Sequence, residues 1–245
     1  MAKDLVQAQV DCLVANNQSV LAAKSATSTI PVVFVTGGDP VGIGLVSSLS
    51  HPGGNVTGIS FTSAPLDTKR FGLMHEIVPK DRTIAFLIDS NTPASEGQLQ
   101  AMQRAAQAVD RKLLVVRAEK ESDLDDRFST IAKANAGGII IGTGPFFLAY
   151  RYRLIALADR HNLPVSYSQR EYVEAGGLMS YGTSQTDAYR RAALYVARIL
   201  RGEKPGDLPV QLPDKYELVV NMKTARKMQV EFPSGIFAII DEMIE

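Results

Sequence analysis

The chain is poor in reactive side chains and has no excess charge of either sign. The chain has one cysteine, Cys12, so an internal disulfide is excluded. Cys12 lies in an apolar run, which favours a buried, inert thiol. Its three histidines, His51, His75 and His161, share no metal-ligand spacing. Lysine plus arginine equal aspartate plus glutamate, at 26 each, so nothing marks a surface for nucleic acid. We therefore expect no metal, no cofactor and no nucleic-acid partner.

Several motifs of membrane proteins and enzymes are also absent from the sequence. No apolar run approaches the roughly 20 residues that span a bilayer, and the first residues lack the apolar core of an export signal. Neither a Gly-x-Ser-x-Gly elbow nor a phosphate-binding Gly-Lys-Ser/Thr loop occurs. Gly142-Thr143-Gly144 lacks the third glycine of a dinucleotide site. The sequence therefore does not predict an enzyme.

The most informative stretch lies between residues 32 and 60. Two apolar runs, Val32–Val35 and Val56–Ser60, are typical of buried strands. Between them we expect a short helix, with Asp39 at its N-cap and Pro40 at its first position. Open α/β sheets bind ligands at the carboxyl ends of their strands, so this joint indicates a small-molecule cleft.

Strands and helices alternate along the rest of the chain, as in parallel sheets with crossover helices. One helix is expected over 186–200, and the residues on its apolar side are Tyr189, Ala193, Val196, Ala197 and Leu200. The pattern breaks near 61–65, 180–184 and 205–213, which predicts two lobes joined by three crossings. We expect lobe 1 to comprise 1–62 with 181–208, and lobe 2 to comprise 63–180 with 209–245.

Candidate ligand contacts in lobe 1 follow the expected strand ends. Asn17, Gln18 and Ser19 begin a helix whose free N–H groups suit a carboxylate, although simple capping predicts the same residues. Asp39 could accept from a ligand ammonium or cap its own helix, and the two roles are compatible. Thr62, at the first crossing, could donate to the ligand or serve as an ordinary turn residue.

Candidate contacts in lobe 2 occupy the same kind of position. Asp89 and Asn91 end a strand, where an Asx turn is the alternative role. Phe146 follows a Gly-Thr-Gly-Pro turn, and one of the two phenylalanines there could stack on an aromatic solute while the other packs in the core. Glu171 could contact an amine or pair with its neighbouring arginine. Tyr181 could line the cleft or pack at the hinge.

Several motifs in order resemble the substrate-binding proteins of ABC transporters, in the branch that includes tryptophan- and tyrosine-binding members. The resemblance covers the chain from about residue 3 onward. The motifs are Ala22-Ala23-Lys24 with Thr27–Pro31, Gly38–Val41, His51-Pro52-Gly53-Gly54-Asn55-Val56-Thr57-Gly58, Arg170–Gly182 with its Gly-Gly-Leu-Met-Ser-Tyr-Gly, and Glu217–Asn221.

The resemblance implies an α/β, two-lobe type I periplasmic-binding fold with parallel sheets, flanking helices and a ligand in the hinge cleft. It also implies a periplasmic location, an amino-acid-like solute and delivery to an ABC permease. The implied position of the Glu171 side chain supports an amine contact. Relatives begin with an export signal and a strand–helix–strand that this chain lacks, so lobe 1 is expected to be incomplete. An exposed sheet edge promotes pairing, and the alternative function is a homodimer that binds no solute.

Overall fold

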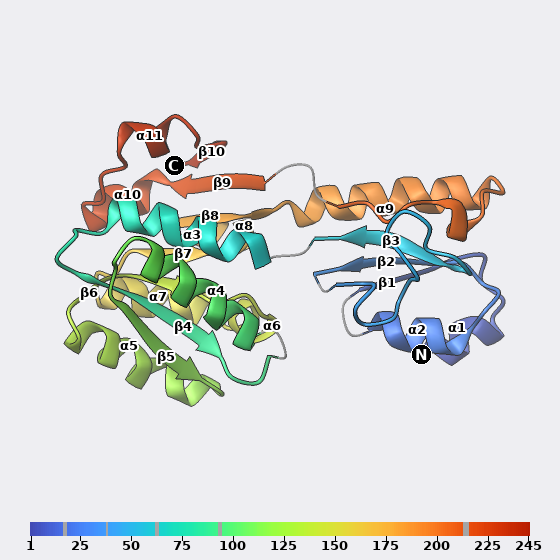
Figure 1. Cartoon of the computed structure of the whole chain (residues 1–245), viewed down its shortest axis with the longest axis horizontal. Helices are drawn as coiled ribbons and strands as arrows, with labels where there is room; N and C mark the ends of the chain where they lie inside the picture. The colour runs from blue at the N-terminus through green and yellow to red at the C-terminus, as the bar shows by residue number, and fades with distance from the viewer. Residues whose placement is uncertain (17–18, 38, 62–63, 93–94, 213–215) are drawn as a thin grey trace. The chain divides into compact units, whose positions relative to one another are not determined.

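The computed structural model of the chain describes residues 1–16, 19–37, 39–61, 64–92, 95–212 and 216–245. It divides into two compact α/β units (Figure 1). Unit 1 comprises Met1–Ser63 and Thr183–Lys215, and unit 2 comprises Ala64–Gly182 and Tyr216–Glu245. Among the described residues, no helix is long and apolar enough to cross a membrane.

The third crossing lies later than the sequence predicted. Residues 209–212, expected in lobe 2, belong to unit 1. The backbone N–H of Val210 donates to the Leu49 carbonyl at 2.7 Å, and that of Gln211 donates to the Gly58 carbonyl at 3.0 Å. These bonds hold the extended segment beside strand β3 (Val56–Ser60) and the loop before it, so the boundary falls after residue 212.

Unit 1 is a three-stranded parallel sheet, in the order β1-β2-β3, with helices on both faces (Figure 1). Side chains alternate between the faces, so Val33 and Val35 pack against α9, while Val32 and Phe34 pack against α2. The elements are α1 (Ala2–Gln7), β1 (Leu13–Asn16), α2 (Ser19–Ala26), β2 (Val32–Thr36), β3 (Val56–Ser60), α9 (Gln185–Leu200) and η2 (Pro205–Asp207).

The helix expected between β2 and β3 does not form in the part of this segment that the structure describes. Asp39 Oδ1 accepts the N–H of Val41 at 3.0 Å, which makes a tight turn. The N–H of Ile43 then reaches the Asp39 carbonyl at 3.1 Å, which closes one helical turn. Gly44 follows with φ of 71°, a left-handed conformation that stops the helix. The prediction of Asp39 as a helix N-cap was therefore wrong.

Helix α9 buries a different face from the expected one. Its buried residues are Ala188, Ala192, Tyr195 and Ile199. Tyr189 and Leu200, expected on the apolar side, are 42% and 58% exposed. The small alanines let the helix approach β2 and β3 closely, and Tyr195 and Ile199 pack beside them in the same buried cluster.

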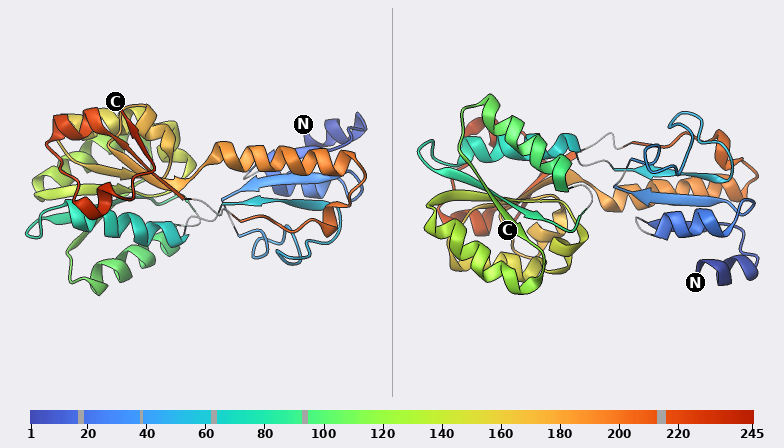
Figure 2. Two further views of the ribbon diagram at one scale, coloured as in Figure 1. Left: turned by 90° about the horizontal axis from the view of Figure 1, so that it is seen from above. Right: turned by 60° about the horizontal axis from the view of Figure 1, so that its bottom comes forward.

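Unit 2 is a seven-stranded sheet in the order β10-β9-β8-β7-β6-β4-β5. Helices cover both faces of the sheet (Figure 2). One buried apolar cluster lies under α5, α7 and α8, and another lies under α3 and α4. The elements are α3 (Ala64–Ile77), β4 (Thr83–Asp89), α4 (Ser95–Ala108), β5 (Leu113–Ala118), η1 (Glu121–Asp123), α5 (Leu124–Lys133), β6 (Ala136–Ile141), α6 (Pro145–Ala149), α7 (Arg151–Arg160), β7 (Val165–Tyr167), α8 (Arg170–Glu174), β8 (Met179–Thr183), β9 (Tyr216–Asn221), α10 (Met222–Met228), α11 (Ser234–Phe237) and β10 (Glu242–Ile244).

Two glycines allow backbones to approach one another where no side chain fits. A Cβ on Gly58 in β3 would lie 2.2 Å from the Phe34 carbonyl oxygen on β2. A Cβ on Gly182 in β8 would lie 2.0 Å from the carbonyl oxygen of Ser168, just after β7. Both positions therefore require glycine for packing, not for a special backbone conformation.

Candidate functional site

Two loops meet at the carboxyl edge of the unit 2 sheet. The first begins at Asp89, the last residue of β4, and contains Thr92. The second follows β6 and contains Gly144. A Cβ on Gly144 would lie 3.1 Å from Thr92 Oγ1 and 3.7 Å from Asp89 Oδ2. This edge is where open α/β sheets bind ligands.

The side chains of Asp89 and Asn91 shape the loop after β4. Asp89 is 5% exposed. Its Oδ1 accepts the N–H of Asn91 at 2.9 Å, and its Oδ2 accepts the hydroxyl of Thr92 at 2.6 Å. The Asn91 amide donates to the Glu119 carbonyl at 2.9 Å. The structure thus contains the Asx turn that was the alternative role of Asp89, and contact of either residue with a solute stays a prediction.

Two buried polar side chains, Gln98 and Arg70, bond to the loop after β6. The Gln98 amide donates to the Thr143 carbonyl at 2.9 Å and accepts the Thr143 N–H at 2.9 Å. The guanidinium of Arg70 donates to the Ile141 carbonyl at 2.5 Å and to Thr143 Oγ1 at 3.2 Å. Gln98 is 7% exposed and Arg70 is fully buried, so this loop is fixed by the core of the unit.

Arg70 is paired with an equally buried carboxylate, Asp67, one turn earlier in α3. Burial raises the pKa of Asp67, and the guanidinium of Arg70 partly opposes that rise. Asp67 Oδ2 and Arg70 Nε have no hydrogen-bond partner among the described residues. Sequence reasoning missed this pair, although two opposite charges three residues apart on the apolar face of α3 could have signalled it.

Phe146 lies in the short helix α6, directly after the turn at Gly144. Because Pro145 is favourable at the first helical position, α6 begins there. The partly buried ring of Phe146 lies 5.1 Å from Phe147 and 5.2 Å from Tyr150. Phe147 is fully buried and is the one that packs in the core.

Glu171 does not pair with its neighbouring arginine, contrary to the alternative that the sequence offered. Arg170 instead bonds Glu174 at 2.6 Å and takes both carboxylate oxygens of Glu242 at 2.6 and 2.8 Å. Arg170 thereby ties β10 to α8. Glu171 is half-buried in the first turn of α8.

Tyr181 lies in β8 with its ring 6.2 Å from that of Tyr216 in β9. Burial, with smaller contributions from Tyr216 and Asp241, raises the pKa of Tyr181. The phenol is therefore a neutral hydrogen-bond donor near pH 7.

In unit 1, the predicted Ser19 caps the joint between β1 and α2. Its hydroxyl accepts the N–H of Asn16 at 3.0 Å and donates to the Asn16 carbonyl at 2.8 Å. The Asn16 amide donates to the hydroxyl of Tyr189 at 3.0 Å. Asn16 and Tyr189, which sequence reasoning did not select, thus join the carboxyl edge of this sheet. The predicted Asn17, Gln18 and Thr62 lie outside the described residues.

The model of the ABC transporter substrate-binding protein family matches residues 1–244. The chain belongs to this family. The match confirms the resemblance seen in the sequence, and the family is one of solute-binding proteins rather than enzymes. A curated tyrosine-binding protein of Clostridioides difficile strain R20291 is 24% identical over 229 residues, which is 94% of this chain and 64% of that protein. The chain thus spans just under two thirds of that relative.

Solved structures confirm the type I periplasmic-binding fold. A conserved domain protein from Vibrio cholerae matches with a TM-score of 0.84 and 29% identity, covering 99% of this chain and 81% of that one. A streptococcal ABC domain in complex with L-Trp matches with a TM-score of 0.83 and 24% sequence identity, and the match covers 100% of this chain and 84% of that one. The ligand-free, open structure of a substrate-binding protein with adhesive properties from Clostridium difficile matches with a TM-score of 0.75 and 24% sequence identity. The match covers 99% of this chain and 81% of that one.

Proposed function

We propose that this protein is the solute-binding component of an ABC importer. It captures a small amino-acid-like solute, with aromatic amino acids as first candidates, in a cleft between its two lobes. It acts in the periplasm, delivers the solute to a membrane permease and performs no reaction on it. The observation that carries the proposal is the family match over residues 1–244.

The chemistry of the two carboxyl edges supports an amino-acid-like solute. Polar side chains and helix starts offer acceptors for an ammonium group and donors for a carboxylate. Phe146 and Tyr181 offer partly buried aromatic surface for the body of the solute. The names of two relatives, one tyrosine-binding and one complexed with L-Trp, support the same choice.

A thermal-shift titration tests the proposal. We expect L-Trp, L-Tyr or L-Phe to raise the melting temperature, because a ligand at 100 times its Kd stabilises the native state by about 2.7 kcal/mol. Tryptamine and indole-3-propionate, which each lack one charged group, should shift it less. Absence of a shift with every amino acid would contradict the proposal.

Substitutions sharpen that test. Phe146→Ala and Tyr181→Ala should weaken binding of the aromatic amino acid. Phe237→Ala is the matched control, because Phe237 is an aromatic residue of α11 that is 48% exposed and is not among the candidate contacts. Equal weakening in all three variants would argue against the assigned contacts.

A second candidate is a homodimer that binds no solute, and one observation favours it. Strand β1 ends the order β1-β2-β3 in the described part of unit 1, and Val14 on it is 57% exposed. An open edge with an apolar side chain promotes pairing with a second copy. Light scattering decides between the two. A dimer that Val14→Lys dissociates, with no ligand-induced thermal shift, would favour this candidate, whereas a monomer with a shift would exclude it.

A further inference from the structure

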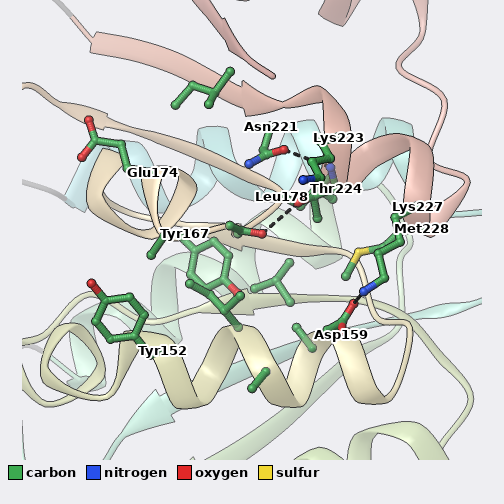
Figure 3. A pocket seen from close by; sticks show the side chains of 18 of the residues that line it. Tyr152, Asp159, Tyr167, Glu174, Leu178, Asn221, Lys223, Thr224, Lys227 and Met228 are labelled. Atoms are coloured by element: carbon green, nitrogen blue, oxygen red, sulfur yellow. Dashed lines mark hydrogen bonds and ion pairs between the residues drawn. The ribbon is translucent and has the colours of Figure 1, made fainter.

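Unit 2 contains a cavity of about 540 Å³ (Figure 3). It is lined by residues of α7, β7, the connection from α8 to β8, the end of β9, α10 and the last two residues of the chain. Val165 and Leu178, which line it, stand where β7 and β8 begin. Because β4, β6, β7 and β8 are parallel, the cavity lies at the opposite edge of the sheet from Asp89.

A buried phenol forms part of the cavity wall. Tyr167 is 1% exposed and its ring stacks on that of Tyr172, with centroids 4.5 Å apart. Its hydroxyl has no hydrogen-bond partner among the described residues. In Figure 3 this ring stands among the lining side chains, facing α7. A buried hydroxyl without a partner is unfavourable, and the adjoining cavity is the route by which a partner could reach it.

The lining also carries one uncompensated charge. Asp159 and Lys227 form an ion pair across the cavity (Figure 3), and the two glutamates of the lining pair with arginines outside it. Among the described lining residues, Lys223 is the charged side chain that has no ion pair. Thr224, next to it, uses its hydroxyl proton on the Gly176 carbonyl at 2.9 Å, so its oxygen keeps a free lone pair.

We propose that this cavity is a second binding site, for a small organic carboxylate with an apolar body. The carboxylate pairs with Lys223, and the body packs between α7 and the ring of Tyr167. The volume falls within the range of small-molecule sites, which combine mostly apolar walls with a few polar groups. This site is separate from the solute cleft, and binding here does not depend on the proposed transport role.

Calorimetric titration of the full chain with 3-phenylpropionate tests the proposal, with 3-phenylpropionamide as the uncharged matched probe. We expect the acid to bind and the amide to bind at least tenfold more weakly. Lys223→Gln should weaken the acid about tenfold, since a lost charge-assisted contact is worth roughly one decade. Lys133→Gln, at an exposed position of α5, should leave the affinity for the acid unchanged.

Two further variants keep the test falsifiable. Ala156→Trp, at an exposed lining position of α7, should abolish binding by filling the cavity without altering the far-UV spectrum. Tyr167→Phe should raise the melting temperature of the unliganded chain by removing the unpartnered hydroxyl, and should reduce the shift that the acid produces. Equal binding of acid and amide, unchanged binding in Ala156→Trp, or displacement of the acid by saturating L-Trp would overturn the proposal.

Discussion

The loops at the carboxyl edges of the two sheets are held in different ways. In unit 2, the loop around Thr143 is fixed by Gln98 and Arg70, which reach it from the protein interior. In unit 1, the loop after β2 is shaped by the side chain of Asp39, bonded two residues ahead, and by the left-handed Gly44. The loop of unit 2 therefore depends on buried side chains from the core. The loop of unit 1 depends mainly on local turns, with one added bond from the exposed Lys24 side chain to the Gly44 carbonyl.

This difference has a consequence for how each loop can fail. A loop fixed by buried polar groups loses its shape only when those groups are left unpaired, which is costly in free energy. A loop shaped by local turns loses less when one contact is removed, because exposed groups bond water instead. The following predictions test this contrast, from the largest expected effect to the smallest.

The largest effect should come from Arg70→Met. It leaves Asp67 buried without its cation, so we expect the free energy of unfolding to fall by about 3–5 kcal/mol. Urea denaturation monitored by circular dichroism measures it. Arg153→Met is the control, because its ion pair with Asp125 is exposed to solvent and its loss should change the free energy of unfolding far less. Recovery of stability in Asp67→Leu/Arg70→Met would confirm that the unpaired charge is the cause.

Gly58→Ala should break the packing of the unit 1 sheet. The added Cβ would overlap the Phe34 backbone, at an expected cost of about 1–3 kcal/mol. Hydrogen exchange of the β2 and β3 amides would detect it. Gly72→Ala is the opposite control: it lies inside α3 with no atom within 4 Å of the new Cβ, so it should stabilise by up to about 1 kcal/mol. A neutral Gly58→Ala would show that the strands can separate freely.

Gln98→Leu should release the loop around Thr143. Two backbone groups lose their partner, so we expect a loss of about 1–3 kcal/mol and a smaller ligand-induced thermal shift. Gln103→Leu, at an exposed position of the same helix, is the control and should change neither quantity. An undiminished ligand shift in Gln98→Leu would separate the loop from solute binding.

Asp39→Ala should have the smallest effect on stability. Asp39 is exposed and its bond to the Val41 N–H is local, so the loss should be about 0.5–1 kcal/mol. Asp39→Asn keeps an accepting oxygen, so it should retain most of the free energy of unfolding that Asp39→Ala loses, in the same urea denaturation experiment. A larger loss in both variants would show that the carboxylate has a charged partner.

Much of the fold could be predicted because its signals are local. The β-branched runs at 32–36 and 56–60 form buried strands, and parallel strands end at one edge, which brings Asp89 beside the loop of Gly144. The helix after Asp39 was wrong because a good start signal cannot reveal that Gly44 ends it one turn later.

The parts that escaped prediction depend on distant residues. The bond from Asn16 to Tyr189 joins positions 173 apart in the chain, and no spacing rule predicts it. The spacing of Asp67 and Arg70 could have signalled their pairing, but the bond from Arg70 to the Ile141 carbonyl of β6 joins positions 71 apart and could not be predicted. Helix α9 carries apolar side chains on more than one side, so the sequence alone does not decide which face is buried. In the structure, the face with Ala188, Ala192, Tyr195 and Ile199 packs on the sheet.

The close approach at Gly182 makes that position a diagnostic one for protein engineering. A side chain there would push β8 away from Ser168, the residue that follows β7. Gly182 is also the last residue of unit 2 before the chain enters unit 1. In a saturation library, residue 182 should therefore tolerate no replacement, while the exposed Gly97 of α4 accepts many. A sequence that carries a side chain at the equivalent of position 182 would have to make this crossing with a different backbone path.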